Sequence, residues 1–122
     1  MVHVGEYGAV NTPDDGFLIT TTENIPGHEV SQVYGEVFGL TVRARNVGSD
    51  IGAGLKSLAG GELKGLTKAL VMAREQAVQR MMEQAKTVGA NAVVMMRFDV
   101  GEARGIGTEV CAYGTAVTVV KT

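Results

Sequence analysis

The sequence predicts an α+β fold of two layers, in which an antiparallel sheet carries one long helix and one short helix. Residues 62–88 repeat apolar side chains at spacings of three and four, which is the pattern of a helix with one buried face. Residues 92–100 alternate in polarity and residues 109–121 are rich in valine and threonine, which is typical of strands. A length of 122 residues is enough for one domain with a substantial core.

Residues 1–16 are predicted to be a leader that precedes a single domain at residues 17–122. The dense turn signal Asn-Thr-Pro-Asp-Asp-Gly at residues 11–16 separates the two. The leader has no basic segment followed by an apolar one, so it does not read as a signal peptide. The domain then opens with a β-branched run at residues 17–22, which predicts a strand, and a turn at residues 23–27.

An extended segment is predicted at residues 29–45. Its apolar residues fall on both faces, and Gly35 and Gly39 are expected to mark bulges or bends. The segment leads into a glycine-rich stretch at residues 45–65, here called the hinge. Apolar residues of the hinge recur at helical spacing, which predicts the short helix of about three turns. The residues that carry this pattern are Ile51, Leu55 and Leu58.

The glycines of the hinge do not form a nucleotide-binding motif. A phosphate-binding loop needs glycine, lysine and a hydroxyl residue in direct succession, whereas Leu55 separates Gly54 from Lys56. A dinucleotide-binding fingerprint needs a third small residue, a position that Ser57 fills poorly. Neither kind of nucleotide site is expected.

The apolar surface of the predicted elements exceeds what one chain can cover. The long helix is expected to face the sheet through Leu66, Leu70, Ala77 and Met81, and its apolar stripe is wider than that contact requires. The last strand is apolar on both sides, although a sheet with one helical layer needs only one apolar face. The excess is predicted to be buried between subunits, which makes the protein a homo-oligomer.

Few residues could support catalysis. The single thiol, Cys111, could act as a nucleophile only with His3 or His28 as its base, and a buried structural cysteine is the reading we favour. Closely spaced cysteine and histidine ligands of the kind that bind zinc do not occur. We therefore expect neither an enzyme nor a cofactor.

Composition limits the partners and the location. A formal net charge of -2 gives no basic surface for nucleic acid. No run of about 18 apolar residues could span a membrane. A single cysteine fits a reducing compartment. A cytoplasmic protein without nucleic-acid or membrane partners is expected.

Six short segments resemble the YbjQ family, also called UPF0145 or DUF74. They are TTENIPG at 21–27, RNV at 45–47, DIGAGL at 50–55, GGELKG at 60–65, GANAVV at 89–94 and YGTAV at 113–117. The resemblance covers about residues 18 to 120. It implies a small α+β subunit similar to the dodecin-like β-α-β-β class, assembled into a ring that is typically a pentamer. Members are often described as heavy-metal-binding, but the family offers no shared catalytic or metal-ligand motif to transfer.

Polar residues of the first turn and the hinge are candidates for ligand binding at clefts between subunits. They are Glu23, Arg45, Asn46 and Asp50. Asn46 and Asp50 are one helical turn apart beside a predicted helix N-terminus, and their alternative role is capping and turn formation. The chain is thus either a module that binds a metal ion or small ligand, or a purely structural ring-forming protein. A tight zinc, copper or cadmium site is not expected from one thiol.

Overall fold

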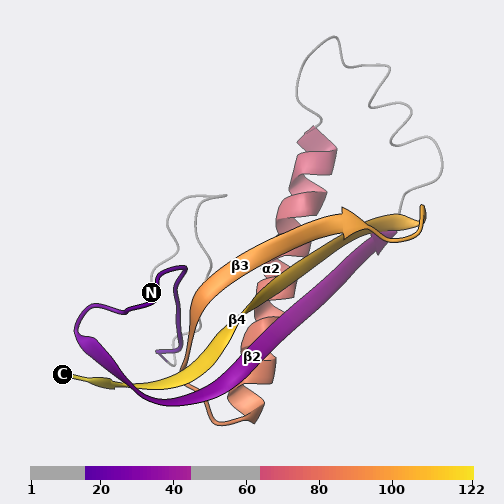
Figure 1. Ribbon diagram of the computed structural model, residues 1–122. Helices are drawn as coiled ribbons and strands as arrows, with labels where there is room; N and C mark the ends of the chain where they lie inside the picture. The colour runs from indigo at the N-terminus through magenta and orange to yellow at the C-terminus, as the bar shows by residue number, and fades with distance from the viewer. Residues whose placement is uncertain (1–15, 45–63) are drawn as a thin grey trace.

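A computed structural model describes residues 16–44 and 64–122 of the chain (Figure 1). They form four strands and one helix in the order β1, β2, α2, β3 and β4. The bounds are Leu18–Ile19 for β1, His28–Ala44 for β2, Lys64–Thr87 for α2, Ala92–Glu102 for β3 and Gly107–Lys121 for β4. The predicted short helix of the hinge lies outside the described residues. In the described ranges, no helix has both the length and the hydropathy needed to cross a lipid bilayer.

The strands form one sheet in the order β1-β3-β4-β2, and α2 lies across one of its faces (Figure 1). The succession β2, α2, β3, β4 is the β-α-β-β order that the family resemblance implies. Both β2 and β3 run antiparallel to β4, but β1 runs parallel to β3. The sheet is therefore mixed, and the prediction of a fully antiparallel sheet was wrong. The chain crosses to the far edge of the sheet after β1, so β1 pairs with β3, which runs in the same direction, instead of with β2.

The helix α2 packs on the sheet through a face of small side chains. Ala73 and Ala77 are fully buried on this face, as is Met81. Opposite them lies Gly39 of β2, where an added Cβ atom would overlap the backbone oxygen of Ala77 and the backbone nitrogen of Met81. The backbones of α2 and β2 can approach this closely because position 39 carries no side chain.

Two of the four predicted helix contacts are confirmed, since Ala77 and Met81 are buried in the core. Leu70 keeps 37% of its surface exposed, so its predicted place in the core was wrong. The reason is visible in Figure 1, where the N-terminal half of α2 rises away from the strands. The side chain of Leu66 is not among those described.

Bulges bend both β2 and β3. One register shift of β2 falls between Val33 and Gly35, and Gly35 takes a φ of 114°, as a predicted bulge site should. Gly39 is instead paired in regular register, so the bulge or bend expected there is absent. Its glycine serves the close approach of β2 to α2. In β3 the register shifts before Arg97, and Met95 has a φ of 58° within the shift. Extra residues of this kind increase the local twist of a sheet.

Residues 17–25, here called the N-terminal segment, cover one end of the sheet face opposite α2. Thr20 holds the segment along β3, because its N–H donates to Val93 O at 3.0 Å and its carbonyl accepts from Met96 N at 3.0 Å. Leu18 and Ile25 pack against a second buried apolar cluster on this face. The cluster consists of Ala92, Val94, Val117 and Val119.

Two side chains of α2 close part of the outer edge of β2. The N–H of Phe38 donates to Oε1 of Gln84 at 2.7 Å, and Nη1 of Arg80 donates to Leu40 O at 2.6 Å. These backbone groups point away from β4, and in the described sheet no further strand lies beyond β2. Unpaired backbone N–H and C=O groups of an edge strand can pair with a strand of another molecule. Side chains of α2 thus occupy these two backbone groups at the edge of β2. The sheet face opposite α2 stays open to another molecule.

We expect Gly39→Ala to destabilise the protein and Gly65→Ala to have no such effect. A methyl group at position 39 would push α2 off β2, at a cost of about 1–3 kcal/mol. Gly65 lies near the start of α2 with open space around it, so alanine there should stabilise the helix by up to about 1 kcal/mol. Thermal unfolding of the two variants tests the difference. Equal melting temperatures would contradict the close contact at Gly39.

Candidate functional site

An apolar surface remains uncovered at the other end of the sheet face opposite α2. In β2, Val37 and Thr41 are buried on the side of α2. Successive side chains of a strand point to opposite faces, so the residues between them point away from the helix. Residues of β4 in register with these extend the same surface. We call it the open face, and its members are Phe38, Leu40, Val42, Cys111 and Tyr113.

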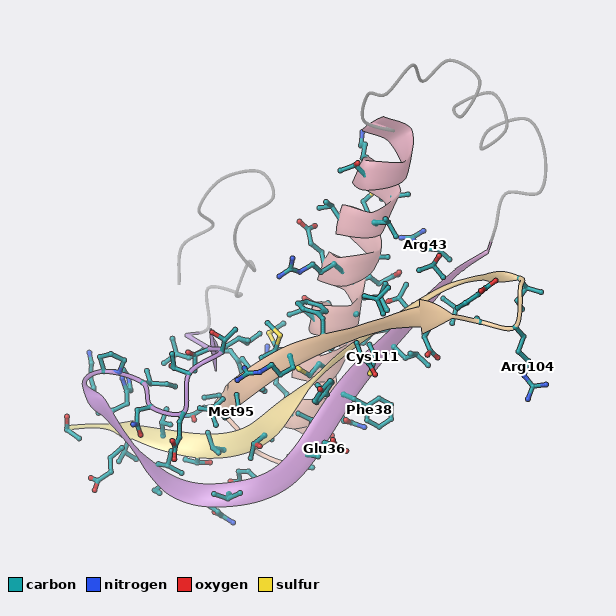
Figure 2. The ribbon with its side chains drawn as sticks, turned by 45° about the horizontal axis from the view of Figure 1, so that its top comes forward. Glu36, Phe38, Arg43, Met95, Arg104 and Cys111 are labelled. Carbon is teal, nitrogen blue, oxygen red and sulfur yellow. The ribbon has the colours of Figure 1, made fainter. Side chains whose placement is uncertain are left out.

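The open face exposes large apolar side chains at successive outward positions. Phe38 is 49% exposed, Leu40 is 38% exposed and Val42 is 47% exposed. Tyr113 lies across from Phe38, and Cys111 lies across from Leu40. Figure 2 shows Phe38 and Cys111 on neighbouring strands of this surface. Contiguous apolar patches of this kind mark contact surfaces, whereas singly scattered apolar residues do not.

Three carboxylates border the open face. Asp99 of β3 lies across from Cys111, and Glu109 lies across from Val42. Glu36 lies two residues before Phe38, on the same side of β2 (Figure 2). The open face is therefore apolar at its centre and acidic at its border.

The arginine that shares this face does not neutralise the carboxylates. Nη1 of Arg97 donates to Thr21 O at 2.9 Å and to Met96 O at 2.8 Å. These bonds direct the guanidinium toward the N-terminal segment. The acidic border thus keeps its negative charge when only the described residues are considered.

Cys111 lies in surroundings that disfavour its thiolate. Burial raises the pKa of the Cys111 thiol above its ordinary value, and the negative charges of Glu109, Asp99 and Glu36 raise it further. Soft metals bind the thiolate, so this environment weakens Cys111 as a ligand. In the described ranges, no group of three or more His, Cys, Asp or Glu side chains could hold a metal ion.

Of the predicted ligand-binding residues, the structure describes only Glu23. Glu23 is described and exposed, in the turn before β2 begins. Arg45, Asn46 and Asp50 lie outside the described residues, in the hinge that follows Ala44 at the other end of the strand. The 17 residues of β2 correspond to about 55 Å of backbone. Within one chain, the structure does not bring Glu23 to the end of β2 from which the hinge continues.

The cysteine and histidine that could have formed a catalytic pair are far apart. His28 begins β2, and Nδ1 of its ring lies 2.9 Å from Pro26 O. Cys111 is in register with Leu40, about 40 Å further along the strand. The described residues therefore do not form this dyad, and His3 lies outside them.

Two buried polar atoms at the end of β2 lack a hydrogen-bond partner among the described residues. They are Oγ1 of Thr41, a residue that is 97% buried, and Nε of Arg43. Both belong to the face of β2 that α2 covers, and Figure 2 shows Arg43 between α2 and the end of the strand. A buried polar group without a partner costs about 1–3 kcal/mol. Each of these two groups can donate a hydrogen bond, so each would be satisfied by an acceptor.

Sequence reasoning did not single out the open face as a site. The alternation of the strand showed which residues share a face with Phe38. Apolar residues fell on both faces of β2, so the sequence did not show which face would be exposed. The decisive information is which face α2 covers. That depends on the contact at Gly39, which the sequence suggested only as a bend.

The fold and the open face define the class of protein: a small α+β protein with one mixed four-stranded sheet, one face of which is left partly uncovered. The chain belongs to the YbjQ family, since the family model described as "Putative heavy-metal-binding" matches residues 17–120. This confirms the family resemblance of the sequence segments.

Close relatives carry the same family name. The UPF0145 protein of Streptomyces avermitilis is 60% identical over 118 residues, which cover 97% of this chain and 98% of that protein. The UPF0145 protein of Streptomyces coelicolor is 65% identical over 104 residues, 85% of this chain and 98% of that one. A crystal structure of a DUF74-family protein of unknown function from Pediococcus pentosaceus is also similar. Its TM-score is 0.48 with 14% identity, over 88% of this chain and 100% of that chain.

We expect Glu109→Gln to lower the pKa of Cys111 and to speed its alkylation. Removing one negative charge stabilises the thiolate, although burial continues to oppose it. The rate of iodoacetamide alkylation measured as a function of pH reports this pKa. Glu83→Gln, on the exposed side of α2, is the matched control and should leave the rate unchanged. Identical alkylation rates for the two variants would contradict the electrostatic environment assigned to Cys111.

Proposed function

We propose that the chain functions as the subunit of a homo-oligomer whose contacts bury the open face. The observation that carries this proposal is the row of exposed apolar side chains formed by Phe38, Leu40 and Val42. Burying a side chain of this size stabilises a contact by about 1.5–3 kcal/mol relative to leaving it in water. Leu18 and Ile25 already cover the other half of the same sheet face. This supports the idea that the open face also needs a cover.

The number of subunits in the proposal comes from the family. The resemblance implies a closed ring, typically of five subunits. A cytoplasmic location is proposed on separate grounds, because a single cysteine fits a reducing compartment. We propose an assembly or binding role for this ring and no catalytic one, because the described residues separate Cys111 from His28.

We further propose that a small ligand or a hard cation binds where subunits meet. Glu23 of one subunit and the hinge residues Arg45, Asn46 and Asp50 of the next would form the site. In the sequence, Glu23 precedes the 17-residue strand β2 and the hinge follows it, which favours a site shared by two chains over a site within one chain. The donors of Thr41 and Arg43, which have no partner among the described residues, favour a ligand that carries acceptor oxygens.

A purely structural ring without a ligand is the second candidate function. The environment of Cys111 favours it over soft-metal binding, because burial and three carboxylates raise the pKa of the thiol and so disfavour the thiolate that soft metals bind. In a structural ring, the partners of Thr41 and Arg43 would be protein groups.

The assembly proposal predicts a particle several times heavier than one chain of 12.8 kDa. Light scattering coupled to size-exclusion chromatography measures that mass directly. Leu40→Asp should reduce it, because the new carboxylate would lie at the centre of the buried contact. A wild-type monomer at micromolar concentration would refute the proposal. A dimer would refute the five-membered ring but not the contact on the open face.

The ligand proposal predicts a bound species in the assembled protein. Native mass spectrometry of the purified oligomer should show an added mass, with at most one bound species per subunit. Thr41→Val should reduce this occupancy because it removes a donor, whereas Cys111→Ser should leave it unchanged. An assembly of bare subunits would favour the structural ring. Loss of the bound species in Cys111→Ser alone would identify a soft metal and contradict the oxygen-rich ligand.

A further inference from the structure

The turn between β3 and β4 presents a second exposed surface. We call residues 100–108 the hairpin arm. Its turn is closed by two hydrogen bonds, from Ala103 N to Gly107 O and from Ile106 N to Ala103 O, both of 2.9 Å. Arg104 and Gly105 have positive φ angles of 49° and 75°, as in the tight turns that suit the twist of a hairpin. The arm is thus an ordered structure with a defined tip.

The hairpin arm carries apolar side chains and one cation into solvent. Val100 is 63% exposed and Ile106 is 66% exposed, more than any apolar residue of the open face. Arg104 extends from the tip away from the rest of the chain (Figure 2). The arm therefore presents a positive charge beside exposed apolar surface.

We propose that the hairpin arm of one subunit binds the open face of a neighbouring copy of this chain. Ile106 would pack against Phe38 and Leu40, and Arg104 would lie against the carboxylates that border the face. This inference rests on the proposed homo-oligomer and specifies which two surfaces form its contact.

The charges favour this pairing over two open faces that meet each other. Each open face is bordered by Glu36, Asp99 and Glu109, whose combined influence is already felt at Cys111. Two such faces in contact would bring like charges together, which is unfavourable. The arm instead brings a guanidinium to these carboxylates, a pairing that is stronger than one between neutral groups.

The edge of β2 supports docking on the face. Another strand could extend the sheet only by pairing with backbone groups on the outer side of β2. The side chains of Gln84 and Arg80 already bond two of these groups, at Phe38 and Leu40. A partner at this position is therefore directed to the side chains of the face.

A contact between two different surfaces has a specific consequence for assembly. Each subunit gives its arm to one neighbour and receives the arm of another, so the subunits join head to tail. Such contacts generate a closed ring when the rotation between neighbours closes. Contact between two identical faces would stop at a dimer.

Mixing two assembly-defective variants tests the proposal. The first variant combines Arg104→Glu and Ile106→Asp, which disables the arm and leaves the open face intact. The second is Phe38→Asp, which disables the face and leaves the arm intact. Each variant alone should fall to the mass of one chain, 12.8 kDa. An equimolar mixture should recover a particle of two chains, because one working arm and one working face remain.

Controls separate loss of the contact from loss of the fold. Met72→Asp changes an exposed apolar residue of α2 that belongs to neither surface, so it should leave the native mass unchanged. Val42→Asp replaces Phe38→Asp if circular dichroism shows that the latter is unfolded. An arm variant that keeps the native mass, or a mixture of folded variants that stays monomeric, would overturn the proposal. Wild-type protein that is itself monomeric would instead overturn the homo-oligomer on which the proposal rests.

Discussion

The close contact between Gly39 and the backbone of α2 determines how this small protein distributes its apolar surface. Because a glycine of β2 meets Ala77 and Met81, the helix can lie directly on the strand. From that position the same helix reaches the edge of β2 with Arg80 and Gln84. One contact thus buries the first sheet face and closes part of an edge that would otherwise remain open to another strand.

The opposite face of the sheet is covered at one end only. The N-terminal segment covers one end with Leu18 and Ile25. At the other end, the outward-facing side chains of Phe38, Leu40 and Val42 remain in water. An isolated chain would keep this apolar surface exposed. A second copy of the chain that packed on it would bury it. In the proposed contact, the acidic border would favour the cationic tip of a hairpin over another acidic face.

The sequence predicted the elements that have a strong internal period. The long helix, both C-terminal strands and the bulge at Gly35 are confirmed, because each depends on local spacing or on one backbone angle. The parallel pairing of β1 with β3 was missed, because the partner of a strand depends on contacts between residues about 70 positions apart. For the same reason, Leu70 was assigned to the core, although the buried side chains that the structure describes in α2 begin only after it, at Ala73. Of the predicted site, only Glu23 is described, and the open face became recognisable only when the position of α2 was known.

The central claim is that contact between copies of this chain buries the open face. Carbene footprinting with mass spectrometry tests it most directly, because the reagent labels side chains according to their exposure. The labelling of residues 36–42 should fall when the protein is concentrated from its dissociated state to its assembled state. A peptide that contains Met72, on the exposed side of α2, provides the internal reference and should be labelled equally in both states. Equal labelling of residues 36–42 in the dissociated and assembled states would show that the assembly leaves the open face in water and would contradict the claim.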